Sequence, residues 1–364
     1  MWNVQDYPQD QKARRRGPFR AGERVQLTDS KNRHYTITLT ADGYFQSRRG
    51  SFYHRDLIGK EEGTLLTTAT GHKLLAFRPL ISDYVLSMPR GATVIYPKDA
   101  GQIVHYADIF PGAQVVEAGL GSGALAISLL AAVGKEGHLT SVERRPEYAD
   151  IARANVESWY GTANLPWEIK IGDLAEVLAD FPPAQIDRVV LDMLAPWENI
   201  AAAARVLVPG GVFLAYVTTI PQLSRLTEEL RISGQFTDPT SFEILLRPWH
   251  VEGLSIRPVH SMVAHTGFLL TARRLAGESA GQLFTPEQLS EAVLPFRGED
   301  SDWEAELDRD FKNEKRIRKI RRAVARRADQ EKSGLSHPGE NMEKLEAQLR
   351  REQKEKICPS KQPE

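Results

Sequence analysis

Three glycines and an acidic residue, each following an apolar segment, are the first indication of chemistry in this chain. Gly119, Gly121 and Gly123 come after one apolar run and directly before another that has helical character. Glycine lets the backbone turn tightly and approach a ligand without interference from a Cβ atom, and the first turn of a helix offers unpaired N–H groups. The next apolar run ends on Glu143, whose carboxylate is placed to accept both hydroxyls of a ribose. This spacing predicts a site for a cofactor that contains a nucleoside.

The residues around the glycines favour one cofactor over another. Gly119-x-Gly121-x-x-Ala124 also fits the loose dinucleotide fingerprint, so the glycines alone do not decide. Glu117 stands where a pyrophosphate would lie and would repel it, but it suits the cationic methionine end of S-adenosylmethionine. Asp173, after a third apolar run, is placed to bind an adenine amino group. We therefore expect S-adenosylmethionine, and a tight strand–helix turn without a ligand is the alternative.

A further carboxylate, Asp192, follows the apolar run 186–191 and precedes Pro196 and Trp197. Methyl transfer to an aminopurine requires the ring nitrogen to meet the sulfonium methyl in line. A carboxylate on the exocyclic amine would fix the base and offset the positive charge that develops on it. Asp192 is also suited to cap a helix that begins near Pro196. We favour the catalytic role, because a strand end is where α/β proteins bind ligands.

Alternating strand and helix signals between residues 86 and 275 predict how these residues are positioned. The expected helices are 123–133, 146–158, 196–207 and 221–233, and the expected strands are 138–143, 167–171, 186–191, 212–217, 241–249 and 265–273. Such alternation predicts an α/β fold with a parallel sheet covered on both faces. Ligands of such sheets bind at the carboxyl ends of the strands, where the acidic residues stand.

Three other zones flank this α/β region. Residues 1–16 are polar and are expected to be flexible. Residues 17–85 hold short alternating runs typical of a small β-barrel or sandwich, at 24–29, 34–39, 43–46, 54–60 and 63–67. Residues 276–364 are a charged, helix-favouring or disordered extension that includes the basic run 312–322. That run fits a solvated helix or tail as well as an RNA-contacting arm.

The composition limits the classes of protein to which the chain can belong. It has 364 residues and a net charge of −1, so no global field attracts nucleic acid. A single cysteine, Cys358, excludes a disulfide within the chain and a cysteine metal cluster. The nine histidines show no metalloprotease-like spacing, and no apolar run has the length of a membrane span. We expect a cytoplasmic protein that needs neither a metal nor a membrane.

The motifs resemble those of one enzyme family. The chain is similar to the bacterial, in particular the actinobacterial, tRNA (adenine-N1)-methyltransferases of the TrmI type over about residues 17–273. The matching segments are 88–92, 95–99, 117–125, 191–197, 224–225, 257–258, 260–262 and 265–269, of which 191–197 is the most diagnostic. The resemblance implies a class I (Rossmann-like) S-adenosylmethionine-dependent methyltransferase behind a small N-terminal β domain. It also implies a homotetramer that methylates N1 of adenine 58 in the tRNA T-loop.

The resemblance also implies a role for each motif residue. Asp192 would be the catalytic aspartate. The predicted donor-binding set is Glu117, Gly119, Gly121, Ser122, Gly123, Ala124, Leu125, Glu143, Tyr148, Asp173 and Asp192, with Glu143 and Tyr148 at the ribose and Asp173 at the donor adenine. One departure is Leu120, where many members carry a smaller residue.

The sequence gives weaker evidence for RNA binding than for the cofactor. A target base buried in folded tRNA must be extruded into the cleft. Basic and aromatic residues that could support it are Arg90, Tyr96, Lys98, Trp197, Arg247, Trp249 and His250, with Arg48, Arg49 and Lys60 available for phosphates. For each of them, packing or solvation is the alternative role. Two other functions stay open: a protein carboxyl methyltransferase of the isoaspartyl type, and a non-catalytic tRNA-binding subunit.

Overall fold

The computed structural model describes residues 15–284, residues 319 and 322, and the pair Leu335–Ser336. These residues fall into two compact units. The N-terminal unit contains residues up to Leu80 together with Leu335–Ser336, and the main unit begins at Ile81. The segment 1–14, Cys358 and nearly all of the basic run 312–322 lie outside the described residues.

The N-terminal unit consists of short strands, as its alternating sequence predicts. One antiparallel sheet, of order β2-β1-β6-β5, contains β1 (Arg24–Asp29), β2 (His34–Thr38), β5 (Thr64–Thr67) and β6 (Lys73–Phe77). A second sheet contains the antiparallel pair β3 (Tyr44–Ser47) and β4 (Gly50–Tyr53). Strand β16 (Leu335–Ser336) joins this second sheet parallel to β3. Apolar side chains such as Val25, Leu27 and Phe45 form the core of the unit.

The expectation of a strand across residues 54–60 is wrong. The chain forms the 3-10 helix η2 (His54–Asp56) there, followed by a turn. The Asp56 carboxylate accepts a hydrogen bond from the Tyr53 amide at 3.2 Å, and the ring of fully buried His54 accepts one from the Thr40 amide at 3.1 Å. These side-chain contacts with the backbone replace a strand ladder. Burial lowers the pKa of His54 to about 4, so its ring is neutral at pH 7.

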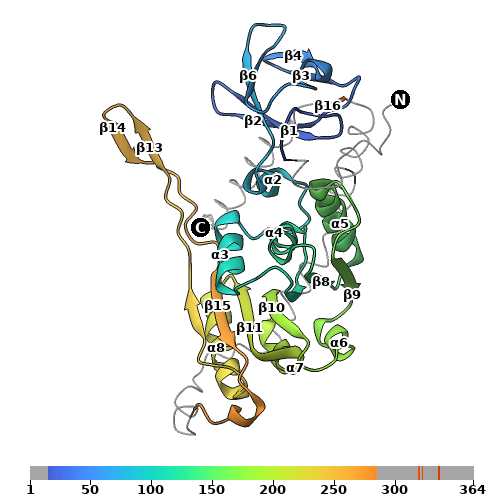
Figure 1. The fold of residues 1–364 in the computed structure, drawn as a ribbon. Coiled ribbons are helices and arrows are strands. Elements are labelled where there is room, and N and C mark those ends of the chain that lie inside the picture. The colour runs from blue at the N-terminus through green and yellow to red at the C-terminus, as the bar shows by residue number, and fades with distance from the viewer. Residues whose placement is uncertain (1–14, 285–318, 320–321, 323–334, 337–364) are drawn as a thin grey trace, which may run out of the picture. The chain divides into compact units, whose positions relative to one another are not determined.

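A seven-stranded sheet of order β12-β15-β11-β10-β7-β8-β9 forms the centre of the main unit (Figure 1). Its strands are β7 (Gln114–Ala118), β8 (His138–Glu143), β9 (Trp167–Ile171), β10 (Ile186–Asp192), β11 (Leu207–Val217), β12 (Thr240–Phe242) and β15 (Phe268–Arg273). Strands β7 to β11 are parallel, and β15 runs antiparallel to both β11 and β12. The strand order reverses between β7 and β10, which is where open α/β sheets bind ligands.

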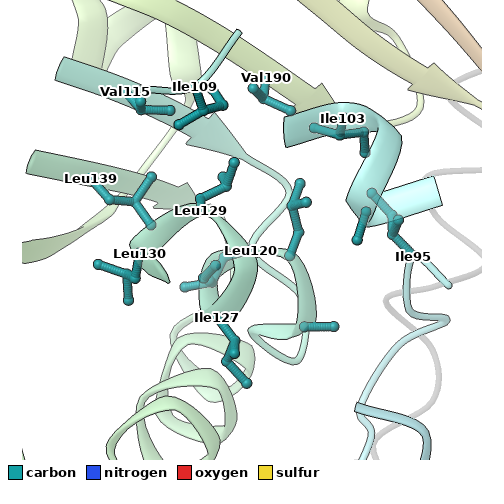
Figure 2. Close-up of a cluster of buried hydrophobic side chains, with 14 of the residues drawn as sticks. Ile95, Ile103, Ile109, Val115, Leu120, Ile127, Leu129, Leu130, Leu139 and Val190 are labelled. Carbon is teal, nitrogen blue, oxygen red and sulfur yellow. The ribbon is translucent and has the colours of Figure 1, made fainter. Parts of the chain in front are cut away.

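Helices cover both faces of this sheet. They are α2 (Ile81–Ser87), α3 (Pro97–Tyr106), α4 (Ala124–Val133) and α5 (Pro146–Tyr160) in one core cluster, and α6 (Leu174–Ala179), α7 (Ile200–Val206) and α8 (Ile220–Ser233) in the other. Successive strand residues serve opposite faces, so Val115 belongs to the first cluster and Val116 to the second. Figure 2 shows Val115 and Leu139 of the sheet beside Leu129 of α4.

Two segments of the main unit differ from the expected elements. The predicted helix 196–207 is the 3-10 helix η3 (Pro196–Asn199) followed by α7, which ends at Val206 where β11 begins. The predicted strand 241–249 is sheet only over β12. Beyond β12 the chain leaves the sheet and forms a separate hairpin, β13 (Trp249–Glu252) with β14 (Ser255–Pro258), seen in gold in Figure 1. Within the described residues, no helix is both long and apolar enough to cross a membrane.

Candidate active site

The glycine loop joins the end of β7 to α4 and touches the end of β10. Gly119 has φ of +90°, and a Cβ atom there would lie 1.8 Å from the carbonyl oxygen of Asp192. A side chain is therefore excluded at Gly119, because the two strand ends meet backbone to backbone. Gly121 differs: a Cβ atom would meet no protein atom closer than 3.7 Å. The Asp192 backbone occupies the space beside Gly119, whereas a Cβ atom at Gly121 would make only ordinary van der Waals contacts.

Glu143, at the end of β8, lies against this loop. Its side chain is buried, and its carboxylate accepts hydrogen bonds from the Gly121 amide at 3.1 Å and from the Arg145 amide at 3.2 Å. The Arg145 guanidinium stacks 3.8 Å from the ring centroid of Tyr148, which is also buried. The predicted ribose residues Glu143 and Tyr148 are thus linked through Arg145, and the carboxylate joins β8 to the glycine loop.

Glu117 is a buried carboxyl group in the middle of the sheet. One of its oxygens, Oε2, accepts a hydrogen bond from the Ser141 hydroxyl at 2.7 Å, and that hydroxyl accepts one from the Trp167 indole at 2.9 Å. The other oxygen, Oε1, is buried with no hydrogen-bond partner among the described residues. Burial, reinforced by the charges of Asp192 and Glu143, raises the pKa of Glu117 to about 8. A buried hydrogen-bond acceptor without a partner is rare in native proteins. At this position it fits a ligand that brings a hydrogen-bond donor.

Asp192 is the last residue of β10 and is partly buried. Burial, and secondarily the negative charge of Glu143, raises its pKa to about 7. The helix-capping role considered for it is not observed, because the N-cap residue of η3 is Ala195. Asp192, Glu117 and Glu143 lie close enough to affect one another's charge. Such a cluster of carboxylates favours a cationic ligand.

The other predicted donor residues serve the fold through their side chains. The buried Ser122 hydroxyl accepts a hydrogen bond from the Gly91 amide at 2.9 Å, and Ala124 and Leu125 belong to the core. Gly123 caps α4 in a left-handed conformation. This segment would therefore contact a ligand through its backbone atoms. Asp173, after β9, caps α6 by accepting a hydrogen bond from the Ala175 amide at 3.1 Å.

Two of the suggested RNA contacts are buried within the main unit. The Lys98 side chain is 5% exposed, and its ammonium group lies 2.7 Å from the Asp99 carboxylate. The Trp197 ring is buried beneath the Arg225 guanidinium, 4.5 Å away. In contrast, Trp249 of the hairpin is 57% exposed. The suggestion is therefore wrong for Lys98 and Trp197 in this conformation, because the fold uses both in packing.

Sequence reasoning missed Tyr216, Asp99 and Thr266, which lie on the same side of the sheet as Asp192. Tyr216 of β11 pairs in register with Asp192 of β10. Thr266 donates a hydrogen bond to Asp99 at 2.7 Å, although 167 positions separate them in the sequence. Asp99 and Thr266 fall within segments that resemble the family, but no local pattern pairs them. The only signal that could have found Tyr216 is the pairing register of β10 and β11, which places it beside Asp192.

Among the described residues, no group of three or more His, Cys, Asp or Glu side chains is placed to hold a metal ion. A cavity of about 470 Å³ is lined by Gln114, His138 and Ile186, the first residues of β7, β8 and β10. It therefore lies at the amino ends of the strands, opposite the glycine loop.

The sheet order and the glycine loop at its reversal point define a class I S-adenosylmethionine-dependent methyltransferase. The chain matches the family models described as TrmI-like N-terminal over residues 17–66 and tRNA methyltransferase complex GCD14 subunit over residues 74–257. It is 35% identical to the Thermus thermophilus tRNA (adenine(58)-N(1))-methyltransferase TrmI, over 68% of this chain and 95% of that protein. The chain belongs to the TrmI family of tRNA (adenine(58)-N(1))-methyltransferases.

Other relatives agree with this assignment. The chain is 31% identical to the Methanocaldococcus jannaschii tRNA (adenine(57)-N(1)/adenine(58)-N(1))-methyltransferase TrmI, over 68% of this chain and 93% of that protein. A crystal structure of a Thermotoga maritima SAM-dependent O-methyltransferase superposes with a TM-score of 0.67 and 27% identity, covering 74% of this chain and 98% of that one. The crystal structure of the Aquifex aeolicus tRNA (m1A58) methyltransferase TrmI superposes with a TM-score of 0.62 and 24% identity. The match covers 71% of this chain and all of that chain, and it supports the same fold.

Proposed function

We propose that this protein transfers the methyl group of S-adenosylmethionine to N1 of adenine 58 in the T-loop of tRNA. The observation that carries the proposal is the contact between the glycine loop and Asp192. Gly119 approaches the Asp192 backbone so closely that no side chain fits between them. A donor held on the loop and a base held by the Asp192 carboxylate would therefore be neighbours. Proximity of this kind accounts for a large part of the barrier lowering in group transfer.

The donor pocket follows from the contacts around the glycine loop. The unpartnered Oε1 of Glu117 suits the ammonium group of the methionine end. Glu143, with Tyr148 beside it, suits the ribose, and Asp173 suits the adenine amine. The absence of a side chain at Gly121 allows the ligand to approach the backbone. When bound, the donor supplies a methyl group already activated by its sulfonium charge.

Asp192 has two tasks at the target base. Its carboxylate accepts a hydrogen bond from the exocyclic amine and so turns N1 toward the methyl carbon. As the bond from N1 to that carbon forms and the carbon–sulfur bond breaks, positive charge passes from sulfur to the base. A fixed carboxylate beside the amine offsets this charge, which is an interaction that strengthens in the transition state. Asp192 must be ionised to do so, although burial raises its pKa to about 7.

The hairpin β13–β14 supports a homotetramer. Its paired residues place apolar side chains on one face, Trp249 with Pro258 and Val251 with Ile256, and polar ones on the other. Trp249, Val251 and Ile256 are each more than half exposed. An isolated two-stranded ribbon is only marginally stable, and exposed apolar patches mark interaction sites. We infer that this apolar face packs against another copy of the chain, within a tetramer.

Incubation of the protein with methyl-labelled donor and unmodified tRNA tests this function. We expect the label in the adenine fraction of digested tRNA, with incorporation stopping near one methyl group per molecule. Asp192→Ala serves as the matched control and should still bind the donor. Label recovered in protein would instead indicate a carboxyl methyltransferase, and no incorporation would indicate a non-catalytic subunit. Either result would overturn the proposal.

A further inference from the structure

A row of polar side chains crosses three neighbouring strands, β9, β8 and β7, on one face of the sheet. The Trp167 indole of β9 donates a hydrogen bond to the Ser141 hydroxyl of β8 at 2.9 Å. That hydroxyl donates one to Oε2 of Glu117 at 2.7 Å, and Ser141 and Glu117 pair in register. Val115, two residues before Glu117, packs in the cluster that contains α4, so the row lies on the side of the sheet that α4 covers. The row runs from the edge strand β9 to the residue two positions before the glycine loop.

This row satisfies only one oxygen of Glu117 when the carboxyl group is ionised. An indole nitrogen can only donate a hydrogen bond, and an ionised carboxylate can only accept one. Trp167 therefore donates to Ser141, and Ser141 donates its single proton to Oε2. Oε1 is buried and has no hydrogen-bond partner among the described residues. The ionised form of Glu117 thus needs one more donor, at Oε1, which a ligand can supply.

The charges around Glu117 oppose its ionisation as long as no ligand is bound. The Arg145 guanidinium lies 3.4 Å from the Glu143 carboxylate and is paired with that neighbour. Burial, and secondarily the negative charges of Asp192 and Glu143, raises the pKa of Glu117 to about 8. A ligand that brings an ammonium group to Oε1 supplies both the missing donor and a positive charge. Glu117 then gives up its proton to the solvent as the ligand binds.

We propose that Ser141 and Trp167 are positioning residues that hold Oε2 of Glu117, so that Oε1 receives the ammonium group at the methionine end of the donor. S-adenosylhomocysteine, the product left after methyl transfer, keeps this ammonium group. Methylthioadenosine keeps the nucleoside and the sulfur but lacks it. Binding of the first compound therefore releases a proton from Glu117, and binding of the second does not. This inference deepens the proposed function and rests on its donor pocket.

Calorimetry in buffers of different ionisation enthalpy counts the protons released on binding. We expect S-adenosylhomocysteine to release most of one proton from Glu117 at pH 7, because a group with a pKa of about 8 is mostly protonated there. The pKa of Asp192 is also raised, so the contribution of Glu117 is the difference between wild-type protein and Glu117→Gln. Methylthioadenosine should show no such difference. Equal proton release by wild-type protein and Glu117→Gln on binding S-adenosylhomocysteine would overturn the inference.

Ser141→Ala and Trp167→Phe test the two positioning residues. Ser141→Ala removes the hydrogen bond to the ionised carboxylate and should weaken S-adenosylhomocysteine binding at least about tenfold, the effect of one hydrogen bond to a charged group. Trp167→Phe keeps an aromatic ring without the indole donor and should give a smaller loss in the same direction. Neither substitution should change the affinity for methylthioadenosine, measured by competition with S-adenosylhomocysteine.

Thr140→Val is the matched control, because Thr140 is the buried neighbour of Ser141 on the opposite face of the sheet. It should leave the ratio of the two affinities at the wild-type value, and a merely structural role for Ser141 would lower both affinities together. An unchanged ratio in Ser141→Ala or, if that variant does not fold, in Trp167→Phe would overturn the inference and leave the proposed function standing. Wild-type protein that binds neither compound would overturn the donor pocket of the proposed function, and the inference with it.

Discussion

The proposed donor side and the proposed base side of the active site are built in different ways. On the donor side, the partners are close in sequence: Glu143 lies 22 residues from Gly121 and two from Arg145. On the base side, Lys98 contacts Thr266 across 168 positions. The donor side is thus one continuous strand–loop–helix–strand unit. The base side forms only when segments far apart in the sequence come together around the folded sheet. Substitutions should therefore separate donor binding from turnover.

The largest expected effect is the loss of turnover in Asp192→Ala. We expect the single-turnover rate to fall about 10²–10³-fold, as when one transition-state hydrogen-bond partner is removed. Donor affinity measured by calorimetry should fall much less than the rate, because Asp192 is only one of the predicted donor-binding residues. Asp192→Asn keeps an acceptor oxygen without the charge and should give an intermediate rate. If the Asp192→Ala rate equalled the wild-type rate, this would contradict the claim that substitutions separate donor binding from turnover.

Gly119 and Gly121 offer a matched pair on the donor side. Gly119→Ala would place a Cβ atom 1.8 Å from the Asp192 carbonyl oxygen, so we expect a destabilisation of roughly 2–4 kcal/mol. Gly121→Ala meets no protein atom closer than 3.7 Å, so only the left-handed backbone at φ +54° opposes it and the melting temperature should fall less than in Gly119→Ala. It should also weaken donor binding, because its methyl group stands where we propose that the donor approaches the loop. Equal melting temperatures for the two variants would contradict this account of the loop.

The third prediction concerns the pH dependence of donor binding. The pKa of Glu117 is raised from 4.5 to about 8, so Glu117 is mostly protonated in the ligand-free protein at neutral pH. Binding of a cationic ammonium requires the ionised form. Donor affinity should therefore rise with pH up to about 8, by at most about tenfold per pH unit from this group. In Glu117→Gln, calorimetry across this range should show a flatter profile, and a profile as steep as the wild type would argue against the assignment.

The same group affects the stability of the ligand-free protein. Between pH 4.5 and pH 8 the folded state binds more protons at Glu117 than the unfolded chain does. The free energy of unfolding should therefore fall as the pH rises through this window. Glu117→Gln should reduce the decline, and Asp192, whose pKa is also raised, accounts for part of the remainder. Chemical denaturation at a series of pH values measures this, and stability that increases over the window would contradict the assigned direction.

The smallest effect is expected at His265, on the base side. Its two ring nitrogens face the Glu243 carboxylate at 2.9 Å and the Thr218 carbonyl at 3.1 Å, so only the doubly protonated ring satisfies both acceptors. These contacts raise its pKa above 6.5. The stability they contribute is complete below pH 6.5 and is lost as the pH rises through the raised value. His265→Gln should remove this small pH dependence from the melting temperature, and Glu243→Gln should reduce it.

The sequence predicts the strands and the loop of the proposed donor side, because these elements are local in the sequence. Strand β8 ending on Glu143 and strand β9 ending before Asp173 follow from apolar runs and their boundaries. It also indicates β10 and Asp192, since a strand end can be recognised without knowing its neighbours. Glu143 was expected to be a ligand for ribose, yet it also holds the Gly121 amide, a contact that depends on the folded loop.

The base side was less accessible from the sequence for a physical reason. Lys98 reads as a surface cation, but the folded chain buries it against Asp99 and Thr266, and no local pattern predicts such a pairing. The hairpin β13–β14 was missed because its apolar residues lack a partner within the unit, so their pattern suggested a sheet strand. The burial of Tyr216 beside Asp192 required the register of β10 and β11.

The position of the methyl group on product tRNA tests the central claim most directly. Reverse transcription of tRNA treated with wild-type protein and donor is blocked where N1 of adenine carries a methyl group. The account predicts a single arrest, at adenine 58 of the T-loop, and no arrest above background after treatment with Asp192→Ala. Arrest at another nucleotide, or equal arrest with Asp192→Ala, would contradict it.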